Sequence, residues 1–310
     1  MKDDTRYIAR ATLDNIELPD EHDEIQFSDF VIRLCPNHAQ PIPVEEEDGT
    51  VTDVDWQYPA KPDTRFPICD YYLEIPFTPV SSKRWKEAED KLVWALNRLR
   101  LFKKGRLWGS LYNVFNAGSP GIQKGLEDIE ALMRRRHTRA PSKGLWLGGF
   151  RNIYSVEENE VTPLTVFVEE MKNVPTKSFE VALRRFHQSF DRDLPDDQAV
   201  DLFIALESLF SEDREAIAYK IALRAACLLE TEPKERKALF VFLKQAYSGR
   251  SKAVHGKSAT SSWWTEGNLA RLEGTVRKAL RQLLQRAKHG MAVKAGSLDD
   301  SLFFSSSELA

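Results

Sequence analysis

The residue types best suited to chemistry lie together in Tyr247-Ser-Gly-Arg-Ser-Lys-Ala-Val-His255-Gly256, at the end of a helical pattern. Arg250 carries a permanent positive charge and a planar fork of donors that matches phosphate oxygens. His255 can take up and release protons near neutral pH. The pair therefore predicts chemistry on a phosphate group without a metal ion or another cofactor.

The spacing of Arg250 and His255 matters, because side chains five positions apart on a continuous helix point about 140° apart. Gly249 interrupts the helical pattern just before the pair. A helix that starts or breaks at Ser248-Gly249 places Arg250 in a first turn, where free backbone N–H groups also favour an anion. We therefore expect both side chains to reach one phosphate.

The segment and its surroundings resemble the HEPN family, a helical fold whose RNase members carry an arginine, a short variable run and a histidine. Arg250-Ser-Lys-Ala-Val-His255 has that form, and residues 178–287 carry the matching helical context. Asp201-Leu-Phe-Ile-Ala-Leu-Glu207-Ser-Leu-Phe and Leu223-Arg-Ala-Ala-Cys-Leu-Leu229 look like the Apea-like branch associated with phage defence. The resemblance implies that Arg250 and His255 are catalytic, although a lone histidine at a helix start also fits a structural role.

Glu207 places a carboxylate in a stripe that otherwise faces the core, because it follows Phe203 and Ile204 by four and three positions. A buried carboxylate needs a partner. Glu207 either orients Arg250, as the acidic position of similar domains does, or binds Arg224 or a backbone donor.

Other residues of the motif have supporting roles with ordinary alternatives. The Ser251 hydroxyl either contacts phosphate or caps a turn. Tyr247 either stacks an RNA base or packs in the core. Lys252 and Lys257 add positive charge for the RNA backbone. Some HEPN toxins carry a tyrosine that a partner enzyme modifies where this chain has Lys257, so we expect control by the chain's own N-terminal domain instead.

The densest basic cluster is Arg134-Arg-Arg-His-Thr-Arg139, beside a helix expected over 125–136. Its cations, Arg134, Arg135, Arg136 and Arg139, either contact an RNA backbone or complement the end of that helix.

Residues 1–75 hold 18 acidic and 6 basic residues, a net charge of −12, which leaves +9 for the remainder. A basic body attracts nucleic acid, and an acidic part either shields it or is only a solvated surface.

The composition indicates a soluble cytoplasmic protein of about two domains, with 310 residues of which 42% are hydrophobic. The N-terminus shows no signal segment, and no run is long enough to span a membrane. Cys35, Cys69 and Cys227 have no C-x-x-C spacing, which favours structural thiols and no metal site.

The fold class expected from these patterns is α+β, with a mixed β/α accessory domain over 1–175, a helical domain over 176–290 and a tail over 291–310. Proline-rich strands are expected first, then a helix from Ser81 to Arg100 and a strand with a turn over 101–108. The expected strands cover 7–13, 25–34 and 71–77, and the expected later helices cover 178–191, 196–211, 213–230, 233–247 and 264–287.

Together these features predict an endoribonuclease that cuts structured RNA, with tRNA favoured, during abortive infection, after a phage-encoded trigger. Attack by a ribose 2′-hydroxyl needs a base and an acid. The motif holds one histidine, so a homodimer is expected, as in similar domains. The alternative is a HEPN module without catalysis that binds RNA or nucleotide, or senses a phage protein.

Overall fold

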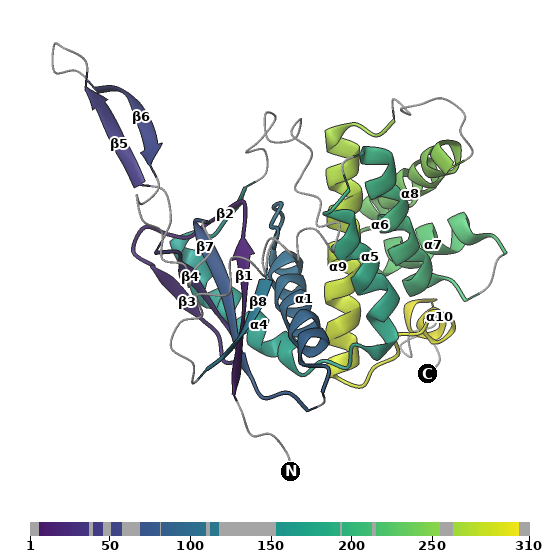
Figure 1. The fold of residues 1–310 in the computed structure, drawn as a ribbon. Coiled ribbons are helices and arrows are strands. Elements are labelled where there is room, and N and C mark those ends of the chain that lie inside the picture. Colours follow the sequence, from purple (N-terminus) through teal and green to yellow (C-terminus); the bar gives the residue numbers. More distant parts are fainter. Residues whose placement is uncertain are drawn as a thin grey trace. The chain divides into compact units, whose positions relative to one another are not determined.

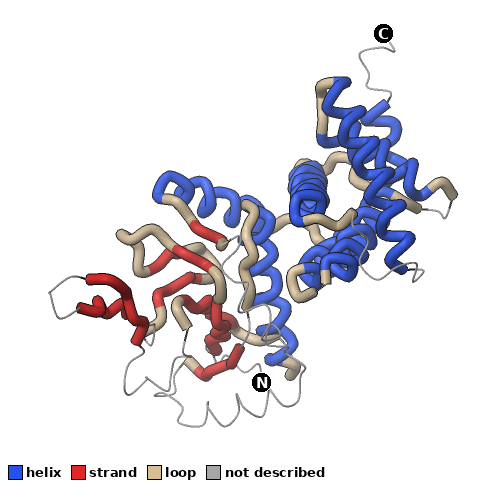
Figure 2. The backbone as a smooth tube through the Cα atoms, turned by 90° about the horizontal axis from the view of Figure 1, so that it is seen from above, coloured by secondary structure: helices blue, strands red, loops and turns tan. Residues whose placement is uncertain are grey.

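The computed structural model describes residues 6–36, 40–45, 51–57, 69–80, 82–109, 112–117, 153–192, 194–212, 215–254 and 263–303. The chain divides into two compact units, Met1–Glu169 and Glu170–Ala310. The first is built on an antiparallel β-sheet with a helix and the second is largely helical (Figure 1). The α+β class is therefore confirmed, and Figure 2 shows the strands gathered in the first unit.

The sheet of the first unit has five antiparallel strands, and two of them, the central strand β7 and its neighbour β1, have the predicted bounds. Its order is β3 (Glu24–Gln26), β4 (Val31–Leu34), β7 (Tyr71–Phe77), β1 (Tyr7–Leu13) and β8 (Tyr112–Asn116). The register of β1 and β7 runs from Tyr7↔Phe77 to Leu13↔Tyr71. Helix α1 (Arg84–Phe102) packs on β1 and β7 and buries an apolar stripe that includes Leu92, Leu96 and Leu99. The helical spacing of these leucines explains why the sequence predicted this helix.

Where one strand was predicted over 25–34, the structure has β3 and β4 joined by a tight turn. The Phe27 N–H donates to the Phe30 carbonyl at 2.9 Å. The two phenyl rings stack with centroids 4.3 Å apart and are buried. Burial of both aromatic rings at the turn favours the reversal over a continuous strand.

The strand predicted over 101–108 is also wrong, because α1 continues to Phe102 and only Trp108 pairs, in an isolated bridge with Asp14. Helix α4 (Glu158–Lys172) was not predicted. Pro163 lies in its second turn. Because an internal proline removes a helical hydrogen bond, its presence in the sequence argued against a helix here.

The remaining strands form two small pairs. Strand β2 (Ile16–Glu17) pairs in parallel with β9 (Tyr154–Ser155), and β5 (Gln40–Glu45) forms an antiparallel hairpin with β6 (Val51–Gln57). The helix expected over 125–136 lies outside the described residues.

The second unit contains all five predicted helices and surrounds α6 with neighbours. Its elements are η1 (Lys177–Phe179), α5 (Glu180–Ser189), α6 (Pro195–Phe210), α7 (Ile217–Leu229), α8 (Pro233–Val254), α9 (Glu266–Lys288) and α10 (Ala295–Phe303). Helix α6 packs against α5, α7, α8 and α9, and its Leu202, Phe203 and Leu206 are fully buried. Because α6 is the shared neighbour, polar side chains on its surface can meet side chains from several helices.

The tail expected over 291–310 contains helix α10, which was not predicted, so the chain is not loose over 299–303 as expected. Leu298 is fully buried, and Asp299 accepts hydrogen bonds from the Arg224 guanidinium on α7 at 2.7 and 2.6 Å. The apolar residues here are too few for a clear helical periodicity, so the sequence did not predict α10. The ion pair that holds it to α7 has no signal in the sequence.

Candidate functional site

Helix α8 runs through Gly249 without interruption and ends at Val254, so the predicted break before Arg250 is wrong. A methyl group on Gly249 would lie 3.5 Å from Trp263 and 3.6 Å from Trp264. These are ordinary van der Waals distances, so the packing of the two indole rings does not itself require glycine here. Glycine inside a helix costs only about 1 kcal/mol relative to alanine, which explains why α8 continues through it.

This continuity changes how Arg250 can bind an anion. Arg250 lies in the last turns of α8 rather than in a first turn, so no free N–H groups of a helix start assist it. The carbonyl end of a helix favours cations over anions. Any phosphate at this position must therefore be held by the guanidinium itself.

Glu207 on α6 is the acidic partner of Arg250. Arg250 Nη1 lies 3.4 Å from Glu207 Oε1, with side chains 20% and 26% exposed. Arg224, the other partner considered for Glu207, binds Asp299 and the Phe210 carbonyl instead. The ion pair orients Arg250 across α6 and α8, but its length leaves the guanidinium loosely held.

The guanidinium of Arg250 also retains donors for a ligand. Its Nε atom is buried, and no described residue supplies it with a hydrogen-bond acceptor. A buried donor without an acceptor costs about 1–3 kcal/mol, and such groups in folded proteins call for an explanation. Phosphate oxygens are among the acceptors that a guanidinium binds.

Tyr247 packs beside Arg250 and is held by the core. Arg250 Cζ lies 5.5 Å from the centre of the Tyr247 ring, which meets Phe203 edge-on at 5.4 Å. Burial, followed by the Glu207 carboxylate, raises the pKa of Tyr247, whereas Arg250 lowers it. The ring is only partly buried, so these packing contacts leave base stacking by Tyr247 as a prediction.

The aromatic support of this site was missed by the sequence reading. Trp264 is buried, with its ring 6.4 Å from Phe203 and 4.8 Å from Trp263. The signal available was the Trp263-Trp264 pair at the start of the helix predicted over 264–287. The rings of Tyr247, Trp263 and Trp264 therefore pack around the turn of α8 that comes just before Arg250.

The structure brings Arg250, Glu207 and Tyr247 together, and the other predicted site residues are not placed. His255, Lys257 and the basic cluster with Arg134, Arg135, Arg136 and Arg139 lie outside the described residues. Ser251 and Lys252 belong to α8, but only their backbone is described. The pairing of Arg250 with His255 therefore stays a prediction.

Comparison with known proteins adds no further assignment. No protein-family model, curated protein or solved structure matches the chain. Within the described ranges, no group of three or more His, Cys, Asp and Glu side chains could hold a metal ion. No helix in the same part of the chain is long and apolar enough to cross a membrane.

Proposed function

We propose that the chain is a metal-independent endoribonuclease of the HEPN type. The observation that carries the proposal is the Arg250–Glu207 pair: a half-buried arginine, oriented by one carboxylate at 3.4 Å, whose Nε has no acceptor among the described residues. A planar guanidinium with available donors suits a phosphate in the transition state. The segment from Arg250 to His255 resembles the RNase motif, and this resemblance is the basis for the type of reaction.

The reaction is an internal transesterification. The ribose 2′-oxygen attacks the adjacent phosphorus and loses its proton to a base, while the bond from phosphorus to the 5′-oxygen breaks and that oxygen takes a proton from an acid. The products are a 2′,3′-cyclic phosphate and a 5′-hydroxyl. His255 exchanges the protons, and Arg250 stabilises the charge on the phosphorane.

A homodimer completes this site. Each motif offers one histidine, whereas the reaction needs a base and an acid on opposite sides of the phosphorus. A two-fold axis near the motif supplies a second histidine and a second arginine from the partner. Glu207 is a positioning residue, since it acts through Arg250.

The proposed setting is the cytoplasm of an infected cell, where a phage-encoded trigger releases cleavage of a structured RNA such as tRNA. The acidic N-terminal part, with its net charge of −12 over residues 1–75, is suited to shield a basic RNA-binding surface until the trigger binds. The alternative is binding of RNA or nucleotide without cleavage, in which Arg250 and His255 only hold phosphate.

The test is incubation of the purified chain with total RNA in the presence of a chelator, followed by sequencing of the new ends. Discrete cuts that carry 2′,3′-cyclic phosphates, and that are lost in Arg250→Ala, support the proposal. Cuts that need a divalent metal, or that persist in Arg250→Ala, argue for another enzyme. Binding without any cut favours the alternative.

A further inference from the structure

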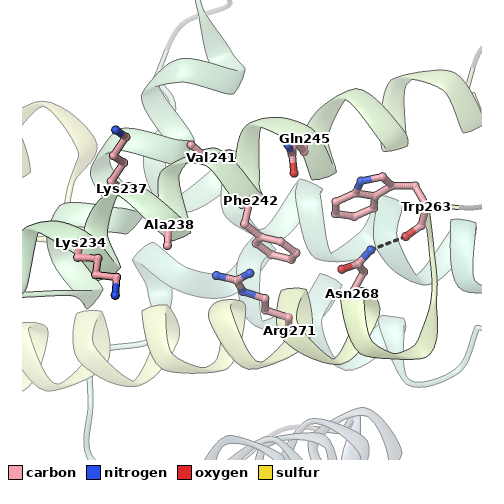
Figure 3. A pocket seen from close by; sticks show the side chains of 9 residues that line it. All are labelled: Lys234, Lys237, Ala238, Val241, Phe242, Gln245, Trp263, Asn268 and Arg271. Carbon is pink, nitrogen blue, oxygen red and sulfur yellow. Dashed lines mark hydrogen bonds between the residues drawn. The ribbon is translucent and has the colours of Figure 1, made fainter.

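A groove of about 480 Å³ lies between α8 and α9, beside Trp263. Lys234, Lys237 and Phe242 line it from α8, and Arg271 lines it from α9 (Figure 3). Cavities of this size hold small molecules or a few units of a polymer. The groove was not anticipated from the sequence.

The charges in the groove favour an anion. Its cations are Lys234, Lys237 and Arg271, and its other lining residues are uncharged. None of the three cations forms an ion pair with an acidic residue in the described ranges. Like charges gathered in one groove repel each other, and an anion between them removes that cost.

The aromatic surface of the groove favours a flat ligand next to the anion. The Trp263 and Phe242 rings lie 5.7 Å apart at a shallow 34° angle, and Arg271 Cζ lies 4.2 Å over Phe242. Phe242 is buried, whereas Trp263 is partly exposed. Trp263 is therefore the ring on which a flat group can stack, while Phe242 and Arg271 support the floor of the groove.

Trp263 is held in place before any ligand binds. The Asn268 side chain donates to the Trp263 carbonyl at 2.7 Å, and the Asn268 N–H donates to the Thr265 hydroxyl, which caps α9, at 3.2 Å. These bonds hold the backbone of Trp263, and its ring lies 4.8 Å from that of Trp264, so the side chain has little conformational freedom to lose on binding.

We propose that this groove binds a single strand of RNA, with phosphates on Lys234, Lys237 and Arg271 and one base stacked on Trp263. This inference rests on the proposed RNase function, because it assigns the groove to a single-stranded part of the RNA substrate. At one end of the groove, Trp263 lies close to Gly249 of α8, one position before Arg250 in the sequence. The 16 positions from Lys234 to Arg250 span about 24 Å of helix, enough for several nucleotides.

Two other occupants fit the groove less well. The bases of a duplex are stacked inside it and cannot reach Trp263. A second copy of this chain, docked with its two-fold axis at the groove, would bring Lys234, Lys237 and Arg271 against the same cations. A single strand offers phosphates to the three cations and an unpaired base to the Trp263 ring.

The test measures fluorescence anisotropy of a labelled single-stranded RNA of roughly twelve nucleotides with the full chain carrying Arg250→Ala, which prevents cleavage. In this background, Lys234→Gln with Lys237→Gln is compared with Lys177→Gln and Arg184→Gln, exposed cations on η1 and α5 that do not line the groove. The groove pair is expected to lower the slope of log affinity against log salt by about 1.4, and the control pair to leave it unchanged.

A second pair of variants tests the stacking. Trp263→Leu is expected to weaken binding about tenfold, and Trp263→Phe to keep most of the affinity, since a ring remains. Thermal melts check that each variant folds, and the lysine variants lie on the exposed surface, so they keep the test decisive if Trp263→Leu does not fold.

The outcomes separate this inference from the proposed function. Cleavage by the wild type, with unchanged binding in both the lysine and Trp263 variants, overturns the groove and leaves the RNase proposal standing. Binding that depends on the groove, without cleavage by the wild type, overturns the RNase proposal and leaves the groove as an RNA site. Tighter binding of a duplex or of ATP than of the single strand overturns the assignment of the occupant.

Discussion

Arg224 and Arg250 are two arginines of the same helical unit with opposite surroundings. Arg224 donates from Nε and Nη2 to both carboxylate oxygens of Asp299, at 2.7 and 2.6 Å, and from Nη1 to the Phe210 carbonyl at 2.5 Å. Arg250 has one acidic contact, at 3.4 Å, and a buried Nε without an acceptor among the described residues. The first arginine joins α7 to α10 with all three of its nitrogens bonded, whereas the second is held by one long ion pair.

The largest effect is expected at the proposed partner of Arg250. His255→Ala should lower RNA cleavage by about 10²–10⁴-fold, the usual contribution of a positioned acid or base. Its melting temperature should stay close to that of the wild type. Cleavage at the wild-type rate in this variant would remove His255 from the reaction.

A lysine at each arginine separates the two surroundings. Arg250→Lys should lower cleavage about 10²–10³-fold and change the free energy of unfolding by less than about 1 kcal/mol, because a point charge does not reproduce a planar fork. Arg224→Lys should lower the free energy of unfolding by about 2 kcal/mol and leave the activity of the folded fraction unchanged. Urea titrations and cleavage assays on both proteins measure the contrast, which fails if both variants lose the same property.

The sequence was a good guide where periodicity is strong. Leucines at helical spacing predicted α1, and all five longer helices of the second unit were recognised. Pairing across helices carries no such periodic signal. The apolar stripe predicted only that Glu207 needs a partner, and the resemblance to similar domains offered Arg250 beside the alternatives of Arg224 and a backbone donor. The pairing of Arg224 with Asp299 was missed.

Gly249 shows why local rules were insufficient at the site. A glycine near the end of a helical pattern usually signals its end. Here Trp263 and Trp264, more than a dozen positions later, pack over Gly249 and α8 continues. The same tertiary packing beside Trp263 creates the groove between α8 and α9, which could not be read from either helix alone.

Mixing of inactive chains tests whether Arg250 acts across a dimer. If one arginine and one histidine from different chains suffice in a composite cleft, equal amounts of His255→Ala and Arg250→Ala chains should regain measurable cleavage, because about half of the randomly paired dimers carry that set. Native mass spectrometry establishes whether mixed dimers form. Mixed dimers without activity would show that a cleft needs two full motifs, and a fully active monomeric wild type would exclude the composite cleft.

A smaller effect is expected at Glu207, which touches Arg250 rather than substrate. Glu207→Gln should lower cleavage about tenfold, as for other residues that orient a functional side chain. Because the amide keeps the size of the side chain but loses the charge, the fold should be preserved. A pH–rate profile distinguishes positioning from acid–base chemistry: positioning lowers the rate at every pH, whereas a limb that disappears would make Glu207 itself an acid or base.

The smallest effect concerns how the Arg224–Asp299 contact changes the stability of the protein at acidic pH. The Arg224 hydrogen bonds hold the pKa of Asp299 below its ordinary value of about 3.9. A carboxylate whose pKa is lower in the folded state stabilises the fold above its unfolded pKa, and this stabilisation is lost as the pH falls through the folded pKa. Asp299→Asn should therefore be less stable than the wild type at neutral pH and lose less stability below about pH 4. Asp300→Asn, the neighbouring exposed carboxyl, is the control and should follow the wild type. Urea midpoints measured from neutral to acidic pH test this, and equal acid dependence in wild type and Asp299→Asn would show that the contact with Arg224 does not stabilise α10.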